Sequence, residues 1–219
     1  MPIAIDVISD VVCPWCYIGK RRLEAALTLW EQAHPGEPPT VIWHPFELNP
    51  TMARSGMDRQ QYLADKFGGP ERAKQIYARV EAAGAEVGIP FAFDRMQIQP
   101  NTTQAHRLIA WATASGRQGD LVEALFRGYF LEQSDLTSDA VLAGIAASAG
   151  LDGEAALAFL GTTEGAEEVR AEEAAAQRMG VSGVPFFVID QRFGLSGAQP
   201  EREIVAALEE ALATATAAH

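Results

Sequence analysis

Only two cysteines occur in this chain of 219 residues, and they stand two residues apart, as Cys13 and Cys16. An apolar strand pattern at residues 3–8 ends just before them, and an amphipathic helical pattern begins with them. A Cys-x-x-Cys pair at a strand-to-helix junction is typical of a redox dithiol. The junction therefore predicts a strand-to-helix unit that presents two thiols at the amino end of a helix.

The residues of this motif predict different tasks for the two thiols. Pro14 suits the first helical position, because its missing N–H would have no partner there and its φ is helix-compatible. Cys13 then becomes the N-cap, where its sulfur can accept from the N–H groups of Trp15 and Cys16 and lies at the positive end of the helix dipole. Both effects favour the thiolate. We expect Cys13 to be the nucleophile and Cys16 the protected thiol that resolves a mixed disulfide, with Pro14 modulating the ionisation of the first sulfur.

Charged residues near the motif leave open whether the Cys13 thiolate is favoured overall. Asp10 lies three residues before the first cysteine, and a nearby carboxylate disfavours a thiolate. Lys20, Arg21 and Arg22 would oppose Asp10 if they folded back, and a solvated helix face is the alternative. His44 and His106 are candidate proton acceptors, or histidines with a structural role.

Two other interpretations of the cysteine pair are weaker. A zinc site would need two further ligands, and the only candidates, His34, His44, His106 and His219, are not at paired metal spacing. A structural disulfide that closes so short a loop would add little stability to a chain of this size. We therefore expect no metal.

Composition and charge narrow the class of protein. Apolar residues make up 48% of the chain, enough for a substantial core in one domain or in one domain with an insertion. The net charge of −12 makes nucleic acid and anionic membrane unexpected partners. The beginning of the chain lacks the basic and apolar regions of a signal peptide, so we expect a cytoplasmic protein.

The order of patterned segments predicts an α/β fold. Strand 3–8, a helix with Leu23, Leu27 and Trp30 on one stripe, and strand 41–46 form a βαβ unit. Strand patterns are absent from residues 51–179, where we expect successive helices that begin near Asp58, Pro70, Thr102 and Ser138, with one last Ala/Glu-rich helix to Met179. Strands at residues 185–190 and 192–196 and a helix with Ile204 and Leu208 complete a ββα unit.

A second motif, Gly183-Val184-Pro185, stands where the helical block returns to strand. A proline there can be held cis in a tight structure, and an ordinary trans proline that begins a strand is the alternative.

Together, the two motifs and the element order resemble the thioredoxin superfamily, specifically its DsbA-like branch. Local segments are similar to the cytoplasmic FrnE-type subgroup, itself related to 2-hydroxychromene-2-carboxylate isomerases and kappa-class glutathione transferases: Ile8-Ser9-Asp10, Tyr17-Ile18-Gly19, Pro45-Phe46-Glu47-Leu48, Ala105-His106-Arg107-Leu108 and Gly183-Val184-Pro185-Phe186-Phe187. The resemblance implies a thioredoxin-like domain of residues 1–50 and 180–219 with a large all-helical insertion, 51–179, between the βαβ and ββα halves. It also implies that Pro185 is cis and packs against the dithiol.

The same resemblance suggests substrate contacts. Val184 would pair through its backbone with an extended peptide or glutathione. Trp15 would offer an exposed apolar face, or it is a packed aromatic. By position in the related isomerases and transferases, Asn49 and Ser196 would hold glutathione, and ordinary turn chemistry is the alternative.

These observations predict a cytoplasmic thiol–disulfide oxidoreductase that acts on proteins or on small thiols. No metal or tightly bound organic cofactor is expected, and glutathione would enter as a co-substrate. The isomerases and transferases typically carry serine at the position of Cys13, which argues for dithiol exchange here. A glutathione-dependent isomerase or transferase and a non-catalytic, client-binding protein remain the alternatives, and the direction of exchange is not readable from the sequence.

Overall fold

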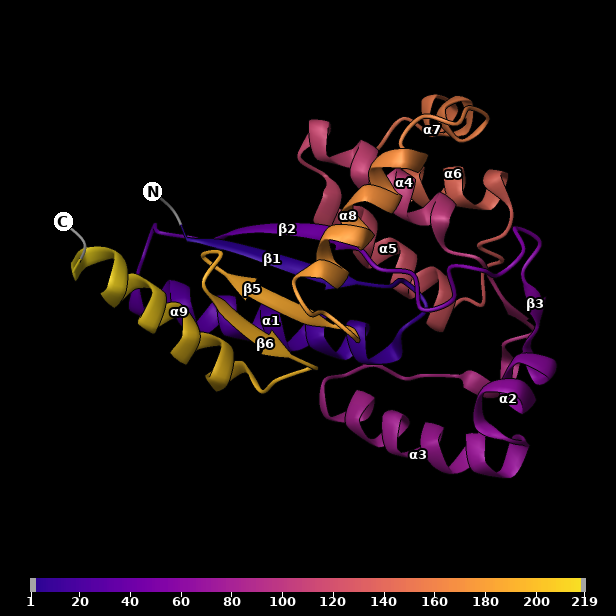
Figure 1. Cartoon of the computed structure of the whole chain (residues 1–219), viewed down its shortest axis with the longest axis horizontal. Coiled ribbons are helices and arrows are strands. Elements are labelled where there is room, and N and C mark those ends of the chain that lie inside the picture. The colour runs from indigo at the N-terminus through magenta and orange to yellow at the C-terminus, as the bar shows by residue number, and fades with distance from the viewer. Residues whose placement is uncertain (1–2, 218–219) are drawn as a thin grey trace.

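A four-stranded sheet organises the protein, whose computed structural model describes residues 3–217 (Figure 1). Its strands lie in the order β2-β1-β5-β6. The first strand, β1 (Ala4–Ser9), is parallel to β2 (Thr40–Pro45) and antiparallel to β5 (Phe186–Ile189). On its other side β5 pairs antiparallel with β6 (Phe193–Ser196). The predicted βαβ and ββα units are therefore confirmed, and they join through β1 and β5.

Side chains point alternately to opposite sides along each strand, so the sheet has two different faces. Ile5 and Val7 belong to the main core, whereas Ile8 belongs to a small separate cluster on the other side. Two helices pack against the main-core side and against each other: α1 (Pro14–Ala33) and α9 (Glu201–Ala217). The long stripe of α1 buries Leu23 and Trp30 there, as its spacing predicts.

Seven helices lie between β2 and β5 in the chain: α2 (Arg59–Phe67), α3 (Pro70–Glu86), α4 (Thr103–Trp111), α5 (Gln118–Phe130), α6 (Asp139–Ser148), α7 (Gly153–Leu160) and α8 (Ala166–Arg178). The predicted starts are confirmed at Asp58 and Ser138, whose side chains accept backbone N–H groups, and at Pro70. Thr102 is the N-cap of α4, but Asn101 supplies the side-chain oxygen that accepts from Thr103. Two 3₁₀ turns, Phe93–Arg95 and Ala112–Ser115, complete this block.

Two expectations for residues 51–179 were wrong. The Ala/Glu-rich run is not one helix, because Asp152 caps α7 and Gly165, at φ 78°, separates α7 from α8. Arg107, buried at 2% exposure, donates to the carbonyls of Phe159 and Thr162 at the end of α7. The segment also contains two short strands, β3 (Met57–Asp58) and β4 (Ile98–Gln99), which are too short to show a period of two.

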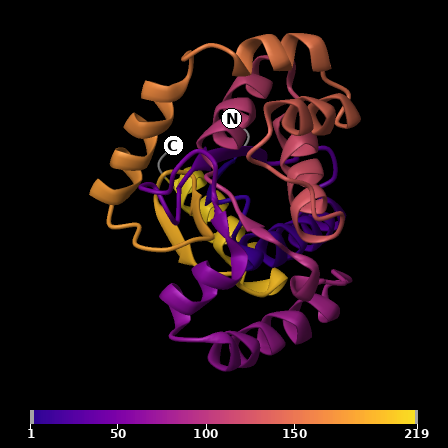
Figure 2. The same ribbon diagram turned by 90° about the vertical axis from the view of Figure 1, so that its right-hand side faces the viewer.

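The helices gather around the end of the sheet where β1 passes into α1 (Figure 2). One core cluster runs from Ile5 and Phe187 of the sheet to Phe126 and Phe130 of α5, so the helical insertion shares its core with the thioredoxin-like part. The division at residues 50 and 180 therefore stays a proposal. None of the helices within residues 3–217 is long and apolar enough to cross a membrane.

Candidate active site

The dithiol lies at the predicted junction. A turn after β1 is closed by the Cys13 N–H, which donates to the carbonyl of Asp10 at 3.0 Å. Cys13 is the N-cap of α1 with extended backbone angles, and Pro14 occupies the first helical position. Both placements agree with the sequence analysis, because a proline at this position needs no hydrogen-bond acceptor.

The expected hydrogen bonds to the Cys13 sulfur are not formed. No N–H at the start of α1 donates to its side chain, and the Cys16 N–H donates to the Cys13 carbonyl instead, at 3.0 Å. Cys13 Sγ turns toward the Val184 carbonyl, 3.6 Å away, and donates to it as a thiol. The prediction of a capping sulfur was wrong for this dithiol state, because the Cys13 sulfur donates to a backbone carbonyl and accepts from no amide of the helix.

Burial separates the two cysteines. Cys13 is 5% exposed and Cys16 only 1%, and neither forms a disulfide. Burial raises the pKa of Cys16 well above its usual range, and the adjacent Cys13 sulfur raises it further, while the Asp10 backbone and the Ser9 hydroxyl partly oppose this. Burial and the neighbouring sulfur thus favour the thiol form of Cys16 over its thiolate.

Of the predicted substrate-contacting residues, Val184 contacts this sulfur directly. Val184 supplies the carbonyl described above, its peptide bond to Pro185 is cis, and β5 begins only at Phe186. Ser196 pairs with Phe186, and the next N–H, of Gly197, donates to the Pro185 carbonyl at 2.8 Å. Trp15 is 39% exposed beside the dithiol, which favours its interpretation as an open apolar face.

Gly19 allows Pro185 to approach α1. A Cβ on this buried glycine would lie 3.0 Å from Pro185 Cγ and 3.3 Å from Phe187 Cζ. We expect Gly19→Val to lower the free energy of unfolding by about 1–3 kcal/mol, the usual cost of overpacking, and to slow thiol exchange by displacing Pro185. Chemical denaturation and insulin reduction measure both effects. Gly144→Val, on an exposed and open face of α6, is the matched control, and an equal loss in both variants would contradict the expectation.

Asp10 faces away from solvent and is paired. Its carboxylate, 0% exposed, accepts from the Leu48 N–H at 2.8 Å and lies 3.3 Å from Nε2 of His106 in α4. Burial is the largest influence on His106 and lowers its pKa, but Asp10, with smaller contributions from Glu47 and Glu173, outweighs it, so the pKa is raised. The balance of charge around Asp10, which the sequence left open between the basic residues of α1 and none, involves His106 of the helical insertion instead.

Glu47 completes this buried polar group and was missed by sequence reasoning. It accepts from the Thr103 hydroxyl at 2.9 Å, and burial raises its pKa. The available signal was its place directly after β2, at the same sheet end as the dithiol. Within residues 3–217, no group of three or more histidine, cysteine or acidic side chains could hold a metal ion, and His219 lies outside the described residues.

The basic residues of α1 do not fold back over Asp10. Lys20 is buried and pairs with Glu24 and with Glu123 of α5, the latter at 2.8 Å, and Arg21 also pairs with Glu123. Arg22 donates to the Ala198 carbonyl. The solvated-face alternative was therefore wrong for Lys20, because this helix face packs against α5.

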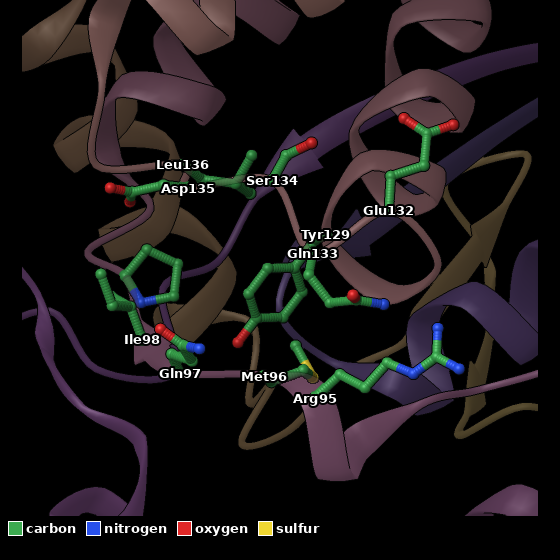
Figure 3. Close-up of a pocket in the computed structure, with 11 residues that line it drawn as sticks. Arg95, Met96, Gln97, Ile98, Tyr129, Glu132, Gln133, Ser134, Asp135 and Leu136 are labelled. Carbon is green, nitrogen blue, oxygen red and sulfur yellow. The ribbon is translucent and has the colours of Figure 1, made fainter.

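Asn49 lies at a cavity that the dithiol motif does not line. It lines a cavity of about 520 Å³ beside α2, together with Tyr62 and Lys66, and neither Cys13 nor Val184 lines that cavity. A second cavity, of about 510 Å³, is formed by two segments, residues 95–100 and 129–136, and Figure 3 shows the Tyr129 ring between them. No residue of the dithiol motif lines this cavity either, so the chemistry suggested by the cysteines is not located there.

Comparison with known proteins gives consistent results. The family model described as DSBA-like thioredoxin domain matches residues 4–209. A probable DsbA oxidoreductase from Streptomyces coelicolor is 35% identical, with a TM-score of 0.86 over 96% of this chain and 90% of that one.

Two more distant structures share the fold. The cytosolic disulfide reductase DsbM from Pseudomonas aeruginosa, in its structure with GSH, is 22% identical, with a TM-score of 0.64 over 95% of this chain and 98% of its own. A 2-hydroxychromene-2-carboxylate isomerase is 15% identical, with a TM-score of 0.66 over 99% of both chains. At these identities the likeness concerns the fold alone.

Proposed function

Because this chain belongs to the DSBA-like thioredoxin domain family, we propose that it is a thiol–disulfide oxidoreductase with Cys13 as nucleophile and Cys16 as resolving thiol. In the reducing direction, the Cys13 thiolate attacks one sulfur of a substrate disulfide, and the other sulfur leaves as a thiolate. Cys16 then loses its proton and attacks Cys13, which releases the second substrate thiol and forms the Cys13–Cys16 disulfide. Two electrons pass to the substrate, and an external thiol such as glutathione restores the dithiol.

One observation carries this proposal: the two sulfurs differ in burial and in partners. Cys13 lies at the Val184 carbonyl and beside exposed Trp15, whereas Cys16 is enclosed and its pKa is raised. A structural pair would need no such difference, but a nucleophile and a resolving thiol do.

Substrates are proposed to bind along Val184. No hydrogen bond of the Val184 N–H is found within the described part of the chain, so this group and the neighbouring carbonyl can pair with an extended peptide or with glutathione. Trp15 and Ser196 would flank that strand. Asn49 would contact only a substrate that extends into the cavity beside α2. We further propose a cytoplasmic location, where glutathione keeps the dithiol reduced and favours work as a reductase.

Equilibration with glutathione buffers tests the proposal. The protein is held at defined ratios of reduced to oxidised glutathione, quenched, alkylated and weighed by mass spectrometry. We expect a two-electron transition between dithiol and disulfide within the glutathione range, together with catalysis of insulin reduction. A dithiol that never equilibrates and does not reduce insulin would contradict it. Protection of an aggregating client under those same conditions would favour the client-binding alternative.

A further inference from the structure

His44 of β2 lies between two carboxylates. Its Nε2 is 2.8 Å from Oδ1 of Asp6 in β1, and its Nδ1 is 2.9 Å from Oε2 of Glu172 in α8. A neutral imidazole has one N–H and can donate to only one of them, so both contacts together require an imidazolium. The hydrogen bond with Glu172 is the main reason that the pKa of His44 is raised; burial opposes it and Asp6 adds to it.

Loss of the proton must release one of the two carboxylates. The deprotonated nitrogen would face an oxygen lone pair, which is repulsive. Asp6 and His44 lie on adjacent strands whose backbone ladder holds them in place. Glu172 belongs to a helix outside the sheet, so the contact to α8 is the one that gives way.

The helix α8 also packs against α4 and against β2. Val169 and Ala176 are its only buried residues, and Glu173 accepts from the Glu47 N–H. Ala176 packs in the small cluster on the open face of the sheet, apart from the main core. A cavity of about 490 Å³ lies between the helix and the sheet, lined by Asp6, Ile8, His44, Glu172, Ala175, Ala176, Met179, Val188 and Gln191. Figure 2 shows α8, in orange, at the left side of the molecule.

The groups around His44 are such that its charge decides whether Glu172 is held at the sheet. Among the described residues that line this cavity, Asp6 from β1 and Glu172 from α8 are the only other charged groups, and β5 and its following turn contribute Val188 and Gln191. No second cation is therefore present in the cavity to hold Glu172 when His44 is neutral.

A short segment connects the end of α8 to the residue that contacts the dithiol. The helix ends at Arg178, and Val184, whose carbonyl is 3.6 Å from Cys13 Sγ, follows a few residues later. Val181 and Val184 both pack in the same small cluster as Ala176. Movement of α8 would therefore move the backbone that the substrate is proposed to pair with.

We propose that His44 is a positioning residue for Val184: as an imidazolium it fastens α8 to the sheet through Glu172, and as a neutral imidazole it frees α8 and the segment that follows. The link to exchange rests on the proposed function, whereas the fastening of α8 does not.

Hydrogen exchange without any thiol substrate tests the fastening. Amide protection of α8 and of residues 180–184, corrected for the intrinsic pH dependence, should fall about tenfold as pH rises through the titration of His44, while that of α1 should not change. In His44→Gln, α8 should be weakly protected at every pH, and Glu172→Ala, which leaves His44 no partner on α8 at that position, should behave likewise. His34→Gln is the matched control, because His34 pairs with Glu209 of α9 at 2.8 Å, away from α8. Protection of α8 that is independent of pH and equal in all variants would overturn the fastening.

Steady-state kinetics with a peptide disulfide tests the positioning. We expect His44→Gln to raise KM several-fold at pH 6 with little change in kcat, and to remove the pH dependence of KM seen in the unmodified protein. If α8 loosens but KM is unchanged, the link to Val184 is wrong. If no variant or unmodified protein exchanges thiols while α8 still responds to pH, the proposed function fails and the fastening stands.

Discussion

Cys13→Ser should lower the rate of insulin reduction by on the order of 10³-fold or more, to the rate given by free thiols in the buffer, because a hydroxyl cannot form the mixed disulfide. Cys16→Ser should behave differently. Its Cys13 can still attack, but nothing inside the protein resolves the product, so one glutathione or one client should stay bound to each chain. Mass spectrometry without reductant shows this adduct directly. The buried position of Cys16 predicts that the opposite variant, with only Cys16 left, forms the adduct far more slowly.

The same variants separate the alternatives. If Cys13→Ser retains a glutathione-dependent isomerisation of an aromatic substrate, the isomerase or transferase alternative is favoured over dithiol exchange. If the double Cys13→Ser, Cys16→Ser variant still protects clients while the unmodified protein exchanges no thiols, the binding alternative is favoured. An adduct of equal rate and amount on either cysteine would contradict the division of tasks drawn from the structure.

His106→Leu should lower the free energy of unfolding by about 3–5 kcal/mol at neutral pH, because it leaves the Asp10 carboxylate buried without its cation. The double variant Asp10→Asn, His106→Leu should lose much less than the sum of the two single variants, since the pair then disappears together. Guanidinium denaturation followed by tryptophan fluorescence measures each free energy. His34→Leu, whose histidine makes an exposed pair with Glu209, should change stability by less than about 1 kcal/mol.

The pH dependence of this effect has a definite sign. The pKa of His106 is raised in the folded protein, so its stabilising contribution is complete below the unfolded value of about 6.5 and disappears as pH rises through the folded value. The unmodified protein should therefore lose stability on the alkaline side, and His106→Leu should show a smaller loss over the same range. Some loss of stability on the alkaline side should remain in His106→Leu, because the pKa of His44 is also raised and His44 is still present. If His106→Leu lowers the free energy of unfolding by less than about 1 kcal/mol and leaves its pH dependence unchanged, the role given to the Asp10–His106 pair is contradicted.

Much of the fold was predictable because its signals are local. Pro14 and Cys13 place the start of α1, Asp58 and Ser138 cap their helices, and the apolar strands return after residue 184. The two-residue strands β3 and β4 were missed because so short a pairing leaves no periodic pattern. The break between α7 and α8 was missed because an Ala/Glu-rich composition suits a helix throughout, and Gly165 did not stand out among the other glycines.

The sequence predicted the placement of the two thiols and the cis bond before Pro185. Spacing and helix position named Cys13 and Cys16 correctly as a pair at a helix start, but the direction of the Cys13 sulfur, toward Val184, depends on a residue 171 positions away. The burial of Lys20 depends likewise on Glu123 of α5, and Asn49 lines a cavity that no residue of the dithiol motif lines.

The amino-acid sequence by itself determined the strands of the main sheet, most of the helices and where two thiols meet a helix, because caps, periodicity and proline geometry act between residues close in the chain. Only the tertiary structure decided how charge is arranged around those thiols. His106 reaches Asp10 from the helical insertion, and His44 pairs with Asp6, 38 positions before it, and with Glu172 of α8, 128 positions after it. Such pairs form because a buried charge is stable only beside an opposite one, and no local pattern records which distant residue supplies it.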